Sequence, residues 1–142
     1  MTMKKPYKIL LSFIKDLSVE TKDTETLLFV KDRISSYQLG IDINSKALKN
    51  KMVEVSTTLS FKDKNNNDKQ SLFTLVYATI IKIDDDLKDK KILEKIILCD
   101  VQKEIYKNLE RIFINLLHDS GFPNIKFEKK IDFEKLYNER LN

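Results

Sequence analysis

The chain has 142 residues, of which 42% are apolar and 34% are charged, and its formal net charge is +4 at pH 7. A chain of this length builds one compact domain, so we predict a single domain over residues 1–142. No apolar run approaches the roughly 20 residues that a membrane-spanning helix needs. The single cysteine, Cys99, excludes an internal disulfide and suits a reducing compartment. We therefore expect a cytoplasmic location.

The basic net charge raises the hypothesis of nucleic-acid binding. Only Arg33, Arg111 and Arg140 among the 26 basic residues are arginine. Arginine reads bases and phosphates with two parallel hydrogen bonds, whereas lysine acts as a mobile point charge. The lysines also alternate with acids along the chain, as in residues 62–64 and 88–91. A basic nucleic-acid-binding module therefore stays as an alternative and is not the first interpretation.

The residue pattern in the first part of the chain predicts β-strands. Apolar and polar residues alternate within residues 13–20, 37–44 and 53–61, which is typical of half-buried antiparallel strands. Residues 72–83 are apolar on both faces, so we expect this strand to be the most buried or to lie at an interface. The polar run at 63–68 predicts a hairpin loop. The residues on the predicted inward faces of these three strands are Phe13, Leu17 and Val19, then Tyr37, Leu39, Ile41 and Ile43, then Val53, Val55, Thr57, Leu59 and Phe61.

Residues 87–120 predict a long helix, because apolar residues recur every four positions. The aspartates at 84–86 suit its N-terminus, Gly121 ends it, and Pro123 prevents its resumption. The predicted helix runs for about nine turns, which is longer than one small sheet covers, so we expect part of its apolar stripe to contact another subunit. The stripe comprises Leu93, Ile97, Val101, Ile105, Leu109, Phe113 and Leu117.

An extended stretch at 125–130 then leads to a final amphipathic helix at 132–141. Strands followed by helices predict an α+β fold. We expect a four-stranded antiparallel sheet with the long helix and the short C-terminal helix packed on one face.

The sequence shows no site for catalysis. His118 and Cys99 are the only histidine and cysteine, and they lie about 28 Å apart along the predicted helix. Two glycines leave little room for phosphate-binding loops, and no metal-ligand spacing is present. We therefore predict a protein that is not an enzyme and that uses no metal or cofactor.

Motifs near the two ends of the chain are the most specific features of the sequence. Residues 13–20 read Phe-Ile-Lys-Asp-Leu-Ser-Val-Glu, and residues 120–123 read Ser-Gly-Phe-Pro. Residues 131–137 read Ile-Asp-Phe-Glu-Lys-Leu-Tyr, while residues 53–55 and 77–81 contribute weaker matches. Together these segments resemble the SecB family of bacterial protein-export chaperones, in the same order and nearly collinear from Tyr7 to Leu141.

The resemblance implies a homotetramer, a dimer of dimers, in which sheets and long helices pair between subunits. It also implies an acidic patch on the sheet for the SecA translocase, which here comprises Asp16 and Glu20. Thr74 stands where the family has a further acid on the fourth strand, and the chain is basic where the family is acidic. The helix also carries Cys99-Asp100 where relatives tend to have Cys-Pro.

The function implied is an ATP-independent holdase that binds unfolded secretory precursors and delivers them to SecA. A SecB-like chaperone dedicated to a toxin–antitoxin client, and a purely structural oligomerisation subunit, are further alternatives. Two apolar segments are candidates for a client-binding groove: the connection at 27–37, which is unusually apolar for a loop, and the last helix. The candidate groove residues are Leu27, Leu28, Phe29, Tyr37, Phe133, Leu136 and Tyr137.

Overall fold

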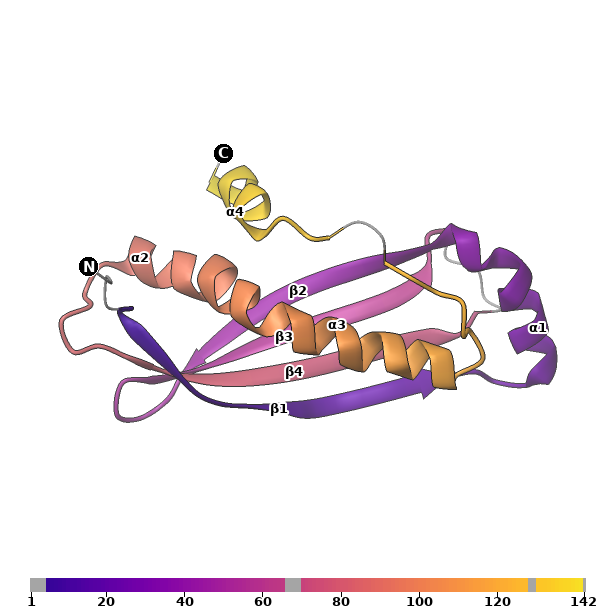
Figure 1. Ribbon diagram of the computed structural model, residues 1–142, viewed down its shortest axis with the longest axis horizontal. Coiled ribbons are helices and arrows are strands. Elements are labelled where there is room, and N and C mark those ends of the chain that lie inside the picture. Colours follow the sequence, from indigo (N-terminus) through magenta and orange to yellow (C-terminus); the bar gives the residue numbers. More distant parts are fainter. Residues whose placement is uncertain (1–4, 66–69, 128–129, 142) are drawn as a thin grey trace.

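A four-stranded antiparallel sheet forms one layer of the molecule, and helices lie against one of its faces (Figure 1). The computed structural model describes residues 5–65, 70–127 and 130–141. The strands are β1 (Tyr7–Glu20), β2 (Tyr37–Ala47), β3 (Met52–Asp63) and β4 (Leu72–Ile83), in the spatial order β1-β4-β3-β2. The α+β class and the four-stranded antiparallel sheet are confirmed.

The helical layer has three parts. α1 (Thr24–Arg33) and a short 3-10 turn, η1 (Ile34–Ser36), connect β1 to β2 at one end of the sheet. α2 (Lys90–Lys95), a π-helical turn η2 (Ile96–Asp100) and α3 (Val101–Asp119) together form the long helical rod across the sheet (Figure 1). α4 (Phe133–Leu141) lies beside η2. No helix among the described residues is long and apolar enough to cross a bilayer.

The core lies between the rod and the inner face of the sheet. Alternate residues of β3 and β4 are buried, as the strand pattern predicts. The predicted stripe on the rod is also buried from Ile97 to Leu117, and only Leu93 at its start is half-buried. Burial of these two faces against each other provides most of the stabilisation of the fold.

The first strand differs from the expected pattern at Phe13. Irregular pairing with β4 between Ile14 and Asp16 shifts the alternation of β1 by one residue. Phe13 therefore faces outward, opposite Ala78, on the same face as Asp16, whereas Leu17 faces inward opposite Leu75. The predicted placement of Phe13 beside Leu17 is wrong because a bulge cannot be read from alternation alone.

The connection after β1 is a helix rather than the expected loop. Asp23 precedes α1, and its carboxylate accepts a hydrogen bond of 2.8 Å from the backbone N–H of Thr26. Glu25 in the first turn and Arg33 in the last turn have the charges that favour the helix dipole. Thr26 and Val30, one turn apart, are the two buried positions of α1, so the apolar run at 27–30 turns only part of its surface inward.

The long rod begins at Lys90, three residues later than the expected start at 87. Asp89 caps it, since its carboxylate accepts a 2.9 Å hydrogen bond from the N–H of Lys91. Asp132 caps α4 in the same way through the N–H of Lys135. At the C-terminal end of α3, Gly121 has a φ of 109°, a left-handed conformation that glycine adopts without strain. The predicted end at this glycine is therefore confirmed.

The π-helical turn η2 interrupts the rod around Cys99 and Asp100. A π turn breaks the regular α-helical hydrogen-bond ladder. The side chain of Gln102 compensates, because its Nε2 donates a 3.2 Å hydrogen bond to the carbonyl of Ile97. Its Oε1 accepts a 2.9 Å bond from the hydroxyl of Thr57 on β3. Both Thr57 and Gln102 are fully buried, so this contact anchors the rod to the sheet.

Replacing Gln102 by leucine is expected to lower the free energy of unfolding by about 1–3 kcal/mol, because the buried hydroxyl of Thr57 then lacks its acceptor. Adding Thr57→Val to that variant is expected to recover part of the loss, since both polar partners are then gone. Urea unfolding of the two single variants and the double variant measures the coupling. Strictly additive losses would contradict a direct interaction.

Candidate functional site

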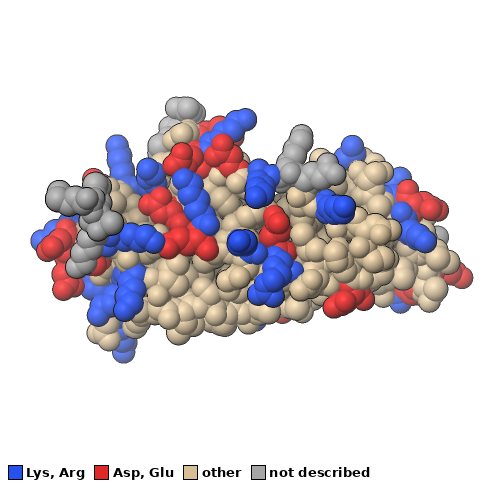
Figure 2. Space-filling view, viewed as in Figure 1, with Lys and Arg blue, Asp and Glu red and all other residues tan. Residues whose placement is uncertain are grey.

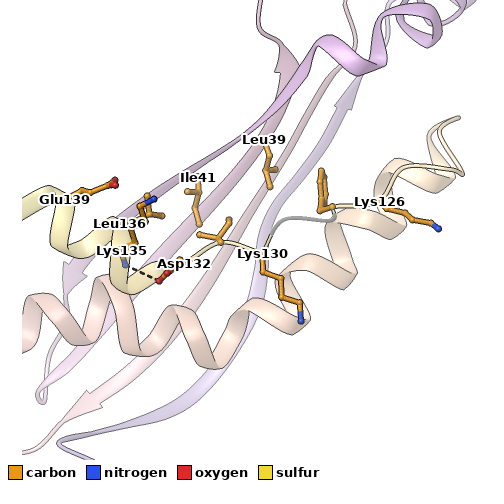
Figure 3. A pocket seen from close by; sticks show the side chains of 10 residues that line it. Leu39, Ile41, Lys126, Lys130, Asp132, Lys135, Leu136 and Glu139 are labelled. Atoms are coloured by element: carbon orange, nitrogen blue, oxygen red, sulfur yellow. Dashed lines mark hydrogen bonds between the residues drawn. The ribbon is translucent and has the colours of Figure 1, made fainter.

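A groove follows β2 along the edge of the sheet and consists of three adjoining hollows, which we call the β2 groove. Their volumes are about 710, 180 and 410 Å³. Ile41 lines the first and second hollows, and Ile43 lines the second and third, so the hollows adjoin one another along the strand. Leu39, Ile41 and Ile43 form the floor, and each of these side chains is half-buried. Figure 3 shows Leu39 and Ile41 facing the first hollow.

The wall opposite β2 is formed by Lys126, Phe127, residues 130–132 and α4. Leu136 lines both the first and the second hollow and is 43% exposed. Phe133 and Tyr137 line the second hollow, but most of their surface is buried against a small cluster around Cys99. The ring of Phe133 contacts that of Tyr106 on α3 edge to face, at 5.4 Å between centroids. α4 is thus anchored by its aromatic residues and presents Leu136 to the groove.

The first hollow has a basic rim. Lys126, Lys130 and Lys135 line it together with Asp132 and Glu139. In Figure 3 the side chains of Lys126 and Lys130 extend away from Leu39 and Ile41. Asp132 is engaged at the start of α4, where it accepts a 3.1 Å hydrogen bond from the N–H of Lys135. An apolar floor with lysines at its margin suits an extended segment with apolar side chains and negative charge.

The structure brings together only part of the predicted groove set. Phe133, Leu136 and Tyr137 line the β2 groove. Leu27, Leu28 and Phe29 lie on α1 instead, where Leu27 is half-buried and packs against Gly121. Leu28 and Phe29 are exposed there.

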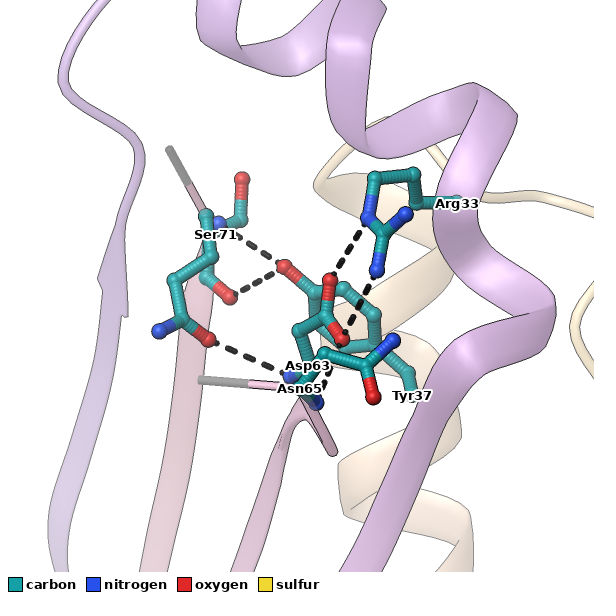
Figure 4. A network of polar contacts seen from close by, with 6 residues as sticks. Arg33, Tyr37, Asp63, Asn65 and Ser71 are labelled. Carbon is teal, nitrogen blue, oxygen red and sulfur yellow. Dashed lines mark hydrogen bonds and ion pairs between the residues drawn. The ribbon is translucent and has the colours of Figure 1, made fainter. Parts of the chain in front are cut away.

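Tyr37 is buried at the start of β2 and belongs to a polar network (Figure 4). Its hydroxyl donates to the carbonyl of Ser71 at 2.8 Å and accepts from the N–H of Ser71 at 2.9 Å. Next to it, the guanidinium of Arg33 donates two hydrogen bonds to Asp63, from Nε at 2.8 Å and from Nη2 at 3.3 Å. Asp63 is not in a hairpin loop, as the polar run predicts, but is the buried last residue of β3. Residues 66–68 of the expected loop lie outside the described residues. The network ties the end of α1 to the sheet.

The Arg33–Asp63 contact predicts a dependence of stability on pH. The hydrogen bond from Arg33 lowers the pKa of the Asp63 carboxyl below its ordinary value. A lowered pKa in the folded state contributes stability that is complete above the unfolded value of about 3.9 and is lost as pH falls through the folded value. We therefore expect Arg33→Gln to destabilise the protein at pH 7, and the difference from wild type to shrink below about pH 4. Urea unfolding at pH 7, 5 and 3 tests this, and a difference independent of pH would contradict it.

The predicted acidic patch lies on the outer face of the sheet, away from the helices. Asp16 and Glu20 of β1 are exposed and share this face with Ser18. Thr74 of β4 pairs with Ser18 and therefore lies beside the two acids. The three positions that the resemblance indicated are thus neighbours on one surface, and two of them carry carboxylates.

The β1 edge of the sheet is apolar and open. Six large apolar side chains of β1 are exposed, and they occupy both faces of the strand. Figure 2 shows a band with few charged side chains along the edge where β1 runs in Figure 1. On the outer face, half-buried residues of β4 continue this surface, as its doubly apolar pattern predicted. The exposed residues of β1 are Leu10, Leu11, Phe13, Ile14, Leu17 and Val19.

Sequence reasoning missed the floor of the groove. It identified Leu39, Ile41 and Ile43 as inward-facing residues of a strand but not as lining residues. It also missed Phe127 and Ile131 on the opposite wall. The available signal was the alternation in β2, which shows which side chains face inward. It does not show that β2 lies at an edge of the sheet, where inward-facing residues stay partly uncovered.

Comparison with known proteins identifies relatives of this chain. The family model described as preprotein translocase subunit SecB matches residues 2–142. A Pelagibacter ubique protein that bears the SecB name is 57% identical, over 99% of this chain and 100% of that protein. A protein-export protein SecB of Parvibaculum lavamentivorans is 25% identical, over 94% of this chain and 77% of its own length.

The fold agrees with this comparison. A Mycobacterium tuberculosis SecB-like chaperone, solved in complex with a peptide from an antitoxin, superposes with a TM-score of 0.67 at 9% identity. The superposition covers 89% of this chain and 88% of that one. Full-length agreement with the family model, a relative of more than half identity and a shared fold lead to one conclusion: the chain belongs to the SecB family of protein-export chaperones, which are not enzymes.

Proposed function

We propose that the protein is an ATP-independent holdase that binds unfolded secretory precursors and delivers them to SecA. The observation that carries this proposal is the β2 groove, whose apolar floor of Leu39, Ile41 and Ile43 stays partly uncovered. The free energy of burying apolar surface depends little on direction, so such a groove can bind segments of many different sequences. A long client that occupies several weak sites at once gains affinity through effective concentration. Fast-folding proteins escape because their apolar residues are soon buried.

A refolding assay tests the holdase. A slow-folding precursor is denatured and then diluted into increasing amounts of the protein without nucleotide. We expect dose-dependent arrest that saturates at a fixed number of subunits per client. Unimpeded refolding at several-fold excess would reject a general holdase and leave a dedicated-client chaperone or a structural subunit.

Delivery to SecA is proposed to use Asp16 and Glu20. Both are exposed on the outer face of the sheet, on the opposite side from the core-facing residues of β1. Two carboxylates at the surface bind a basic partner in a salt-dependent manner. Asp16→Asn combined with Glu20→Gln is therefore expected to weaken binding to purified SecA while leaving refolding arrest intact. Unchanged SecA binding would place the contact elsewhere.

We also propose that the protein is a cytoplasmic homotetramer. The exposed apolar residues of β1 support self-association, because monomers rarely leave an apolar edge strand uncovered. Light scattering measures the mass directly. Leu11→Glu with Phe13→Glu, both at exposed positions, is expected to yield a smaller assembly with an intact fold. A monomeric wild-type protein would reject the tetramer.

A chaperone dedicated to a toxin–antitoxin client is the second candidate. The Mycobacterium tuberculosis SecB-like chaperone of similar fold was solved with an antitoxin peptide. If this chain has a dedicated client, one partner should bind far more tightly than unrelated unfolded proteins. Competition between several unfolded precursors in the refolding assay distinguishes the two hypotheses, because a general holdase should bind the precursors with similar affinity.

A further inference from the structure

Five exposed lysines lie at one end of the sheet, around the hairpin that joins β2 to β3. Among the described residues, none of the five takes part in an ion pair. Figure 2 shows basic side chains, with acidic ones beside them, at the end where this hairpin lies in Figure 1. We call these residues the lysine cluster: Lys8 on β1, Lys46 on β2, Lys49 and Lys51 in the hairpin, and Lys82 on β4.

Lys8 and Lys82 are direct partners across β1 and β4. They point to the outer face of the sheet, because Ile81 and Ile83 on either side of Lys82 are buried in the core. Like charges directly opposite each other in a sheet destabilise the strand pair. On its other side Lys82 faces Met52 of β3, which has no charge to offset the repulsion. The fold therefore holds two cations together on its outer face.

Lys51 occupies the position of the hairpin turn that best suits glycine. Asn50 and Lys51 are the central residues of this turn, and both have a φ of 63°, the sign that a type I′ turn requires. Met52 N–H closes the turn by donating to the Lys49 carbonyl at 3.3 Å. A lysine side chain is strained in this left-handed conformation, whereas glycine is not. Ile83 N–H donates to the Lys51 carbonyl at 2.8 Å and so holds the turn beside the end of β4.

The nearest acids leave the outer face at this end positive. Glu54 is the cross-strand partner of Lys46, but its carboxylate is bound by Lys15 at 2.6 Å. The aspartates at 84–86 begin the connection from β4 to α2, which lies on the helical side of the sheet (Figure 1). Lys8, Lys46 and Lys82 therefore face solvent on the outer face without a carboxylate in ion-pair contact among the described residues.

The chemistry of the cluster indicates an extended anionic surface as its partner. The cluster contains no arginine, the side chain that binds single phosphates and bases with two parallel hydrogen bonds. It also contains no aromatic residue on which the bases of a nucleic acid would stack. Groups of roughly four to eight basic side chains at a protein surface bind acidic phospholipid headgroups through charge.

We propose that the lysine cluster binds the anionic surface of a lipid bilayer. An anionic partner offsets the repulsion between Lys8 and Lys82 and gives the strained Lys51 a use that glycine lacks. The inference goes beyond the holdase function and does not depend on it. Export ends at a membrane, so weak binding there raises the effective concentration of a loaded chaperone at that surface.

The test is co-sedimentation of the wild-type protein with vesicles of phosphatidylcholine, with or without one-third phosphatidylglycerol. We expect binding to the anionic vesicles alone, weakening as salt rises. The triple variant Lys8→Gln, Lys51→Gly, Lys82→Gln is expected to bind at least roughly tenfold more weakly, because each lysine near an anionic surface contributes about fivefold.

This variant should unfold at the same urea concentration as wild type or a higher one, since it removes a like-charge pair and relieves the strained turn. Loss of vesicle binding then cannot come from loss of the fold. The matched control is Lys22→Gln, Lys31→Gln, Lys64→Gln, which changes net charge equally at exposed positions near the opposite end of the sheet. We expect it to weaken vesicle binding less than about threefold. Refolding arrest should persist in both variants.

Equal losses for the two triple variants would assign binding to net charge and overturn the proposal. Failure of the wild-type protein to bind anionic vesicles, or equal binding to pure phosphatidylcholine, would also overturn it. A labelled RNA is measured in parallel. If RNA binds more tightly than the anionic vesicles and depends on the same three lysines, the cluster is a nucleic-acid surface and the bilayer proposal is rejected.

Discussion

Replacing Phe113 by alanine is expected to lower the free energy of unfolding by about 3–5 kcal/mol. Phe113 on α3 is fully buried, and its ring stacks on that of Phe127 at 6.3 Å between centroids. Phe127 in turn contacts Phe61 of β3 edge to face at 5.7 Å. The alanine leaves a cavity between rod, sheet and groove wall. Against a total stability of about 5–15 kcal/mol, this loss is large enough to be seen clearly in urea unfolding.

Ile92→Ala on α2 is the matched control, because Ile92 is also apolar and on the same rod but is 45% exposed. We expect it to change stability by less than about 0.5 kcal/mol. Since Phe127 lines the first hollow, Phe113→Ala should also weaken client binding. A loss of stability below about 1 kcal/mol would show that the aromatic cluster around Phe127 does not hold the groove wall in place.

Replacing Leu136 by serine is expected to weaken client binding about tenfold without destabilising the fold. Leu136 lines two of the three hollows and is 43% exposed, so it contributes little to the core and much to the groove. A client side chain that covers it removes apolar area from water, and serine abolishes most of that gain. Titration of a labelled unfolded precursor by fluorescence anisotropy measures the effect.

Leu28→Ser is the matched control for this variant. Leu28 has the same side chain, is 61% exposed and lies on α1 away from the hollows. Its replacement should leave affinity within about twofold of wild type, since it removes no groove contact. Equal losses for the two variants would indicate that clients bind exposed leucines without regard to the groove. A larger loss for Leu28→Ser would assign client binding to α1.

Local patterns explain why much of the fold could be predicted. Alternation in β3 predicted Val55 and Leu59 as inward-facing, and both are buried. The four-residue recurrence predicted the buried face of α3, and Gly121 predicted its end. In each case the signal comes from neighbours within one element, because side-chain direction follows directly from the backbone period.

The failures share a different cause. The bulge in β1 depends on how that strand pairs with β4, so it reversed the expected side of Phe13. The connection that contains α1 is expected to be a loop, because four consecutive apolar residues at 27–30 show no helical periodicity. The helical spacing appears only in its buried residues, Thr26 and Val30. The role of Tyr37 in client binding stays a prediction, but its place in the fold depends on Ser71, a residue distant in sequence to which its hydroxyl is bound. These outcomes depend on contacts with residues distant in sequence, which a local pattern does not predict.

The sequence by itself determined the strand and helix order, the buried stripe of the rod and, through the motifs at 13–20 and 120–137, the SecB family. Only the tertiary structure decided where a groove lies. Leu39, Ile41 and Ile43 have the pattern of ordinary core residues, and the spatial order β1-β4-β3-β2 leaves them at an edge with each side chain partly uncovered. Periodicity fixes which way a side chain points, whereas exposure depends on what packs over it, and that is settled by contacts between residues far apart in the chain.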